Sequence, residues 1–322
     1  MNINWFPGHM KKTADLLNTN IALVDLSVVV LDSRVPLSSL NPLVEKIICR
    51  KPVLYLLNKA DLADESQTRL WAAWLKGKKN GNVIICSAVQ PAESVRITNA
   101  CFSLCPEAKT GRRGVRVLIT GIPNAGKSTL INTLCGESKA KTGDRPAVTT
   151  KLQKILTRGG LDLYDTPGIL WHKFEDQTAA CRLAATGAIR EEILNLPDIA
   201  LFSIGFLRQY YGKALADRFS LGDVVSEDPV AVLEAVARKR GCIGKGGAVD
   251  WDKAAAVFLR EMRAGKLGRL TFDRWEEFAA AEAVRTAGEA AAENGNADSG
   301  SLSGGGTVQT KPAAGNGASD GV

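Results

Sequence analysis

The sequence predicts an α/β fold, with a mostly parallel sheet covered by helices on both faces and a C-terminal all-α domain. Short apolar, β-branched runs end in polar residues or glycine, and longer stretches of helical period separate them. Because these runs are continuously apolar, they indicate strands that are buried on both faces. They occupy residues 24–32, 53–58, 83–87, 115–120 and 161–165. In such sheets, ligands bind beyond the carboxyl ends of the strands.

After about residue 195 the strand signals fade and helix signals replace them. Asp228 and Pro229 are typical of a helix start, and Gly241 of its end. Residues 251–264 predict a second helix that Gly265 stops. We therefore expect a first domain over residues 1–199 and a helical domain over residues 200–278. We expect a disordered tail over residues 279–322, because its Ala, Gly, Asn and Ser offer little to bury.

Composition indicates a globular protein without a membrane span. The chain has 322 residues, 45% of them hydrophobic, and no apolar run approaches the roughly 20 residues that cross a bilayer. The N-terminus resembles neither a signal peptide nor a transit peptide. The seven cysteines are scattered, with no CxxC pair. This is typical of reduced thiols, so we expect a cytoplasmic location.

The positive charge is concentrated outside the C-terminal tail. Residues 276–322 hold seven acidic and two basic residues, so residues 1–275 hold 39 basic and 27 acidic ones, a net charge of +12. A body this basic favours a polyanionic partner such as nucleic acid. The alternative is a basic surface that serves solubility alone.

Residues 121–128, GIPNAGKS, fit the phosphate-loop pattern G-x-x-x-x-G-K-[ST]. A predicted strand precedes the loop and an amphipathic helix follows it, so its amides would wrap phosphates at a helix N-terminus. Lys127 would reach the β- and γ-phosphates, and Ser128 would bind Mg²⁺. The alternative is a chance glycine loop. The predicted nucleotide contacts of this loop are Pro123, Asn124, Ala125, Gly126, Lys127, Ser128 and Thr129.

Residues 165–168, DTPG, follow the next predicted strand and indicate a loop that senses the last phosphate. Asp165 would hold Mg²⁺ through water, and the Gly168 amide would contact the γ-phosphate. Between the two loops, Thr149 is preferred over Thr150 as a further ligand of nucleotide and Mg²⁺. Without a role in nucleotide binding, DTPG would be a common turn sequence, and the segment around the threonines would be an ordinary ordered loop.

Residues 58–61, NKAD, close another predicted strand and indicate guanine selection. The Asp61 carboxylate can accept both the ring N–H and the exocyclic amine of guanine, whereas adenine leaves it unpaired. Asn58 and Lys59 belong to the same loop. Ser87 and Ala88 end the next strand and are expected to support the base with a main-chain amide.

GTPases usually run phosphate loop, switch, DTPG, NKxD, Ser-Ala, whereas here NKxD and Ser-Ala come first. The cyclic order is kept, which indicates a circularly permuted P-loop GTPase. Together with WFPGHM at residues 5–10, NKAD at 58–61, residues 121–129, RPAVT at 145–149 and DTPG at 165–168, the chain resembles the ribosome biogenesis GTPase A family. The likeness covers about residues 1–275. The chain departs from the family pattern at Ala125 and Ala147, which leaves nucleotide binding intact.

The resemblance implies an enzyme that binds GTP and GDP with Mg²⁺ and hydrolyses GTP when the large ribosomal subunit stimulates it. It implies the large-subunit precursor and its rRNA as partners, with no DNA specificity, and a role late in subunit assembly. It also implies that Asn124 helps bind K⁺, which would neutralise charge between the phosphates. The alternative for Asn124 is a hydrogen bond within the loop itself.

Ras-type GTPases carry a water-orienting glutamine directly after the glycine of this loop. Here Ile169 and Leu170 follow, and neither can hydrogen-bond. The resemblance implies that a histidine of the N-terminal segment replaces the glutamine, which here is His9. An imidazole can hold a water or move its proton near neutral pH. His172 is the competing candidate, and a purely anchoring role is the alternative for His9.

Basic residues of the helical domain are candidates for rRNA phosphates, although each also suits a solvated face or a helix C-terminus. They are Arg238, Lys239, Arg240, Lys245, Arg260, Arg263, Lys266 and Arg269. Two other functions stay open. One is a non-catalytic, GTP-dependent ribosome-binding scaffold, which Ile169 permits. The other is a permuted GTPase of another ribosomal or tRNA pathway, against which the lack of an N-terminal OB-like domain and of zinc-binding cysteines argues.

Overall fold

The structure is a computed structural model that describes residues 9–78, 81–109, 114–137, 153–170, 176–226 and 228–297. Side chains are described within these ranges except at residues 9–14, 108–109 and 289–297. Residues 1–275 form one compact unit and residues 276–322 a second.

The centre of the first unit is a six-stranded sheet with the order β3-β2-β1-β4-β6-β5. Neighbouring strands are parallel except β5, which pairs antiparallel with β6 at one edge. The strands are β1 (Leu26–Asp32), β2 (Val53–Asn58), β3 (Gly81–Ile85), β4 (Val115–Gly121), β5 (Gln153–Leu156) and β6 (Leu161–Asp165). The mostly parallel sheet confirms the predicted fold. The sequence analysis missed β5 because this edge strand is four residues long and buries only Ile155.

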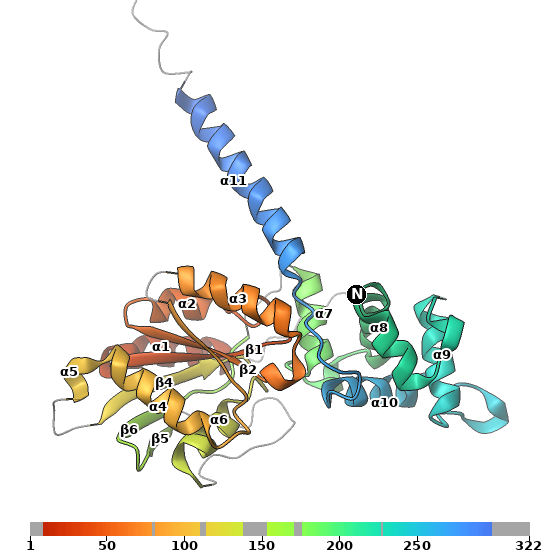
Figure 1. Cartoon of the computed structure of the whole chain (residues 1–322), viewed down its shortest axis with the longest axis horizontal. Coiled ribbons are helices and arrows are strands. Elements are labelled where there is room, and N and C mark those ends of the chain that lie inside the picture. Colours follow the sequence, from red (N-terminus) through yellow and green to blue (C-terminus); the bar gives the residue numbers. More distant parts are fainter. Residues whose placement is uncertain are drawn as a thin grey trace, which may run out of the picture. The chain divides into compact units, whose positions relative to one another are not determined.

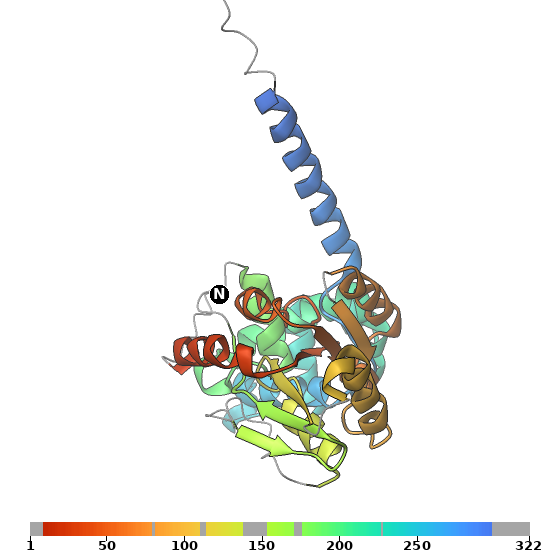
Figure 2. The same ribbon diagram turned by 90° about the vertical axis from the view of Figure 1, so that its left-hand side faces the viewer.

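Helices cover both faces of the sheet (Figures 1 and 2). Leu31 and Leu57 point to the face that carries α1 (His9–Asn20), α2 (Pro42–Ile48) and α3 (Glu65–Gly77). Val30 and Leu56 point to the opposite face, which carries α4 (Glu93–Leu104) and α6 (Lys127–Cys135). The short helix α5 (Pro106–Lys109) follows α4. Because successive side chains of a strand point to opposite faces, each strand supplies two apolar cores.

The C-terminal part of this unit is helical, with α7 (Gln177–Thr186), α8 (Leu196–Phe219), α9 (Pro229–Lys239) and α10 (Trp251–Arg263). As predicted, the Asp228 side chain caps α9, accepting from the amides of Val230 and Ala231. Among the described helices, none is both long and apolar enough to cross a bilayer. Short 3-10 turns are η1 (Ile21–Leu23), η2 (Ala60–Leu62), η3 (Glu191–Ile193), η4 (Gly222–Ser226) and η5 (Lys245–Gly247).

One continuous apolar cluster joins these helices to the sheet. Buried side chains of β1 and β4, of α7 and of α8–α10 belong to the same core. The boundary predicted between residues 199 and 200 falls in the first turns of α8, which begins at Leu196. The division into a nucleotide-binding and a helical domain stays a prediction, since residues 1–275 form a single compact unit.

Residues 270–275, which we term the return segment, run from the helical region back to the sheet region. The amide of Phe272 donates to the carbonyl of Arg34 (2.7 Å). The buried Asp273 accepts from the amide and hydroxyl of Ser38 (2.7 and 2.6 Å) and from Arg182 (3.2 Å). Because these bonds lie far apart in the sequence, they fasten the helical region to the loops after β1.

The predicted disorder from residue 279 is corrected in part by the last helix. Helix α11 runs from Trp275 to Ala297. Its alanines and glutamates have high intrinsic helix propensity, which can form a helix without an apolar face to bury. The rest of the predicted tail lies outside the described residues.

Candidate nucleotide-binding site

The sheet brings motifs that are far apart in the sequence to one edge. In the register of the parallel strands, Asp32 lies opposite Asn58 and Val30 opposite Gly121. Ile119 of β4 lies opposite Asp165 at the end of β6. The loops that follow β1, β2, β4 and β6 therefore leave the sheet at neighbouring positions, where a parallel α/β sheet binds its ligand.

The phosphate loop is a tight turn between β4 and α6. Gly126 has φ of +101°, and a Cβ there would lie 2.2 Å from the Asn58 amide nitrogen. Only glycine fits this position. The buried Lys127 ammonium donates to the carbonyls of Gly121 (3.0 Å) and Ile122 (2.7 Å). The side chain of Lys127 therefore folds back over the start of the phosphate loop.

Burial lowers the pKa of Lys127 to about 8. The carboxylate of Asp165 acts against this shift, whereas the nearby charge of Lys59 adds to it. Burying an ammonium group without an anion in direct contact costs free energy. The electrostatics of the loop therefore favour a polyanion beside Lys127.

Asn58 connects three of the predicted motifs. Its Nδ2 donates to the carbonyl of Ala125 in the phosphate loop (2.8 Å), and its Oδ1 accepts from the amide of Ala88 (2.8 Å). Both partners are buried, so these bonds are shielded from water. The Asn58 amide thus fixes the guanine loop and the Ser-Ala loop against the phosphate loop.

Asp61 lies at the surface, and one of its carboxylate oxygens accepts from the Ser87 hydroxyl (2.7 Å). This bond orients the carboxylate that the sequence assigns to guanine. Lys59 has left-handed φ of 59° and sends its ammonium to the carbonyl of Asn124 (2.5 Å). The structure therefore brings the NKAD, Ser-Ala and phosphate-loop residues together, as predicted.

The sequence analysis missed Asp32 and Arg34. Asp32 ends β1 and accepts two bonds from the Arg34 guanidinium (2.9 and 2.7 Å) and one from Lys59 (3.0 Å). Burial alone would raise the pKa of Asp32, but Arg34 and Lys59 hold it well below its usual range. The sequence feature that could have identified this site is Asp32 itself, an acidic residue at the carboxyl end of a central strand.

The DTPG loop packs directly on the phosphate loop. A Cβ on Gly168 would lie 2.7 Å from the nitrogen of Pro123, so a side chain cannot fit. The amide of Ile169 donates to the carbonyl of Gly121 (3.2 Å). Ile169 and Leu170 are each 1% exposed and pack into the two opposite cores. These two side chains serve the core and have no capacity to orient a water.

Ser128 and Asp165 fit a Mg²⁺ site. Ser128 lies in the first turn of α6, and Asp165 is buried at the end of β6, beside the strand that leads into the phosphate loop. A hydroxyl and a carboxylate are the hard oxygen donors that Mg²⁺ takes together with phosphate oxygens.

The remaining predicted residues lie wholly or partly outside the part of the chain that the structure describes. Thr149 and His172 lie outside the described residues, and so does the alternative Thr150. His9 is the first residue of α1, but its side chain is not described.

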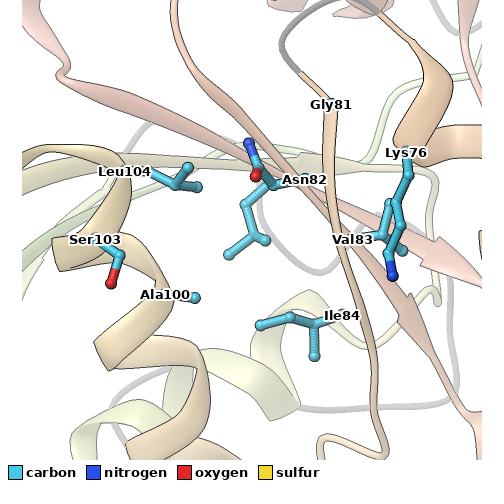
Figure 3. A pocket seen from close by; sticks show the side chains of 9 residues that line it. Lys76, Gly81, Asn82, Val83, Ile84, Ala100, Ser103 and Leu104 are labelled. Carbon is cyan, nitrogen blue, oxygen red and sulfur yellow. The ribbon is translucent and has the colours of Figure 1, made fainter.

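A separate hollow of about 400 Å³ lies at the β3 edge of the sheet (Figure 3). Its walls come from β3, from Leu54 of β2, from the end of α3 and from Ala100, Ser103 and Leu104 of α4. None of the predicted nucleotide contacts lines it. This hollow is therefore not the nucleotide site.

The fold and these loops define a class. A phosphate loop after β4, DTPG after β6 and an NKxD loop after β2 meet at one edge of a parallel sheet, which is the arrangement of a circularly permuted P-loop GTPase. The family described as "50S ribosome-binding GTPase" matches residues 116–208. This match begins in β4 and leaves out the NKAD loop, as the permuted order requires.

Curated relatives then place the chain within this class. Ribosome biogenesis GTPase A of Bacillus cereus is 46% identical over 286 residues, which cover 86% of this chain and 96% of the relative. The protein of the same name from Thermotoga maritima is 31% identical over 286 residues, which cover 89% and 100%. The chain belongs to the ribosome biogenesis GTPase A family.

Solved structures agree with this assignment. GNP-bound YlqF from T. maritima has 30% sequence identity and a TM-score of 0.57, with 82% of this chain and 98% of that chain covered. GDP-bound TM YlqF has 29% identity and a TM-score of 0.59, with 81% and 99% covered. Both neighbours contain a guanine nucleotide, which supports guanine-nucleotide binding in this fold.

Proposed function

We propose that this GTPase binds the precursor of the large ribosomal subunit in its GTP form, promotes late assembly and leaves after hydrolysing GTP to GDP. The observation that carries the proposal is the convergence of the guanine, Ser-Ala and phosphate loops through Asn58, with the DTPG loop packed on the phosphate loop. The net charge of +12 over residues 1–275 fits an rRNA partner, and the family matches are consistent with ribosome assembly. With the ribosomal subunit as the proposed partner, the proposed location is the cytoplasm.

Within the site, the proposed contacts follow from geometry and donor chemistry. The amides of residues 123–129 surround the phosphates at the start of α6. Lys127 exchanges its two carbonyl bonds for phosphate oxygens, and Asp61 pairs with guanine. Mg²⁺, when bound by Ser128, Thr149 and Asp165, neutralises charge on the phosphates.

We propose His9 as the catalytic residue that orients the attacking water. Ile169 is a core residue, so the water needs a polar group from elsewhere. Helix α1 begins at His9, and Leu17 of α1 and Ile21 of the following turn η1 share an apolar cluster with Ile169. The helix that begins at His9 therefore shares an apolar core with the residue that follows the DTPG motif.

Potassium is proposed as a further cation at Asn124. In the structure, the Asn124 amide nitrogen donates to the carbonyl of Gly187 (2.8 Å), and a cation would bind the side-chain oxygen Oδ1 instead. GTP hydrolysis that runs at the same rate in K⁺ and Na⁺ buffers would remove this proposal.

Single-turnover GTP hydrolysis with and without large subunits tests the function. We expect large subunits to accelerate the wild-type protein, and the His9→Ala protein to lose about 100-fold or more of the accelerated rate. Co-sedimentation should show binding to large subunits with a non-hydrolysable GTP analogue and release with GDP. Binding to small subunits alone would contradict the proposal.

A second candidate function is a GTP-dependent ribosome-binding scaffold without catalysis. The buried Ile169, which replaces the usual polar residue, favours this alternative. The two functions differ in one outcome, because a scaffold would co-sediment with large subunits but show no stimulated hydrolysis.

A further inference from the structure

Helix α7 ends at a junction of the phosphate loop, the loop after β1 and the helical region. The last carbonyls of an α-helix have no partner within the helix and must find one elsewhere. At the end of α7, the carbonyls of four consecutive residues, Ala184 to Thr186 of the helix and the capping Gly187, accept from side chains of other elements. Figure 1 shows α7 between the sheet and helices α8 and α10. We term these four residues the α7 turn.

The helical region supplies Arg263, the last residue of α10. Its guanidinium donates to the carbonyls of Ala184 (2.8 Å) and Ala185 (2.9 Å), and it also pairs with Glu191. The side chain is 19% exposed, so these bonds are largely shielded from water. A cation at a helix C-terminus is also favoured by the helix dipole.

The phosphate loop supplies Asn124, whose amide nitrogen donates to the carbonyl of Gly187 (2.8 Å). Gly187 itself lies beneath the Arg263 guanidinium, where an added Cβ would be 3.4 Å from Nε. Its φ of +85° is one that glycine adopts without strain. Within four consecutive residues, the α7 turn therefore bonds to α10 at Ala184 and Ala185 and to the phosphate loop at Gly187.

A second connection closes the junction. Arg34 donates to the carbonyls of Thr186 (3.3 Å) and Arg263 (3.4 Å) and pairs with Asp32. Asp32 pairs in turn with Lys59, whose ammonium holds the carbonyl of Asn124. Asn124 is thus reached from α10 by two chains of bonds, one to its side chain and one to its backbone.

We propose that Arg263 is a positioning residue for nucleotide binding, which sets the conformation of the phosphate loop through the α7 turn. Arg263 acts through Gly187 and Asn124. A partner that moves α10 would therefore change how tightly the nucleotide is held. The inference rests on the proposed nucleotide contacts of the phosphate loop.

The test measures how fast labelled GDP dissociates from the full chain. The label is a fluorescent N-methylanthraniloyl group, and an excess of unlabelled GDP prevents rebinding. The buffer contains Na⁺ and no K⁺. Arg263→Met keeps the aliphatic length but removes all donors. We expect labelled GDP to dissociate on the order of tenfold faster from this variant. Arg260→Met is the matched control, because Arg260 is exposed on the same helix. Its dissociation rate should stay within about twofold of wild type.

A double-mutant cycle separates coupling from a general loss of structure. In an Asn124→Ala background, Arg263→Met should accelerate GDP dissociation by less than about threefold, because only the connection through Arg34 is left. A rate for Arg263→Met equal to that of wild type, or the full tenfold effect in the Asn124→Ala background, would overturn the inference.

If Arg263→Met fails to fold by circular dichroism, Arg263→Lys takes its place in the same cycle. This variant keeps the charge but has a single donor atom in place of the guanidinium fork, and we expect about a threefold effect. Additive effects of Arg263→Lys and Asn124→Ala would contradict the coupling. Failure of the wild-type protein to bind labelled GDP would instead contradict the proposed function.

Discussion

At the scale of single residues, the site depends on side chains that bond to backbone atoms of distant loops. Asn58 holds Ala125 and Ala88, and Lys59 holds Asn124. Each bond joins loops that are separated by 30 or more positions in the chain. A change at one such residue therefore alters a neighbouring motif as well as its own.

Lys127 gives the first prediction. Its pKa is lowered to about 8 in the free protein, mainly by burial, whereas phosphate contact favours the charged form. Above pH 8 the free protein loses this proton and must regain it to bind. We therefore expect the dissociation constant for GDP to be nearly flat from pH 6.5 to 7.5 and to rise toward tenfold per pH unit above about pH 8.

Isothermal titration of GDP at pH 7, 8 and 9 measures this dependence. Lys127→Arg is the control, because a guanidinium stays charged throughout this range. A wild-type dissociation constant that does not change up to pH 9, or the same rise in Lys127→Arg, would contradict the assignment.

At the scale of elements, the DTPG loop and the phosphate loop form one unit with almost no space between them. Gly168 lies against Pro123, and the Ile169 amide bonds to the carbonyl that ends β4. Ile169 and Leu170 then enter the two cores on either side of the sheet. The loop is therefore anchored in the apolar cores on both faces of the sheet.

We predict that Gly168→Ala weakens GDP binding by about tenfold or more, because a Cβ would lie 2.7 Å from the Pro123 nitrogen and backbone clashes of this kind move the loop. Gly77→Ala is the matched control, because a Cβ at Gly77 meets nothing within 4 Å. Fluorescence titration with labelled GDP compares the two variants. Equal affinity of Gly168→Ala and wild type would show that the two loops do not pack as described.

How well the sequence predicts an element depends on how much of it is buried. The central strands β1, β2 and β4 are buried along almost their whole length, and the sequence predicts all three. It also predicts the guanine loop after β2, the phosphate loop after β4 and the DTPG loop after β6. The edge strand β5 and the helix α11 were missed, because neither shows the apolar pattern of a buried element.

The α7 turn could not be predicted from the sequence for a different reason. Its partners Arg34, Asn124 and Arg263 lie in three separate segments, and only the fold brings them to one helix end. A glycine such as Gly187 indicates the end of a helix but not what contacts it. Sequence motifs thus identify loops, whereas contacts among loops require the structure.

At the scale of the whole molecule, residues 1–275 form one compact unit, and one of its two apolar cores extends from the sheet into helices α7 to α10. The return segment adds polar bonds at the contact of the helical region with the sheet region, where Tyr211 and Asp64 also meet (3.1 Å). Asp273 is a buried carboxylate of this segment, with partners in Ser38 and Arg182. A protein built this way should unfold as a unit.

We predict that Asp273→Ala lowers the free energy of unfolding by about 3 kcal/mol, because removing one partner leaves Arg182 and Ser38 with uncompensated buried polar groups. The matched control is Asp223→Ala at an exposed site, expected to stay within about 0.5 kcal/mol of wild type. Urea unfolding followed by both circular dichroism and tryptophan fluorescence measures this. Two separate transitions in the wild type would contradict a shared core.

The central claim is that the permuted motifs form one pocket that selects guanine, and Asp61 tests it most directly. Wild-type protein should bind GDP at least about 10³-fold more tightly than ADP or xanthosine diphosphate, because only guanine offers two donors to the carboxylate. Asp61→Asn exchanges one acceptor for a donor and should lose GDP affinity while gaining affinity for xanthosine diphosphate, whose base has an oxygen where guanine has its amine. Calorimetric titration of the three nucleotides into both proteins gives the answer. If wild type binds ADP as well as GDP, or if Asp61→Asn keeps the wild-type preference, the motifs do not form the pocket described.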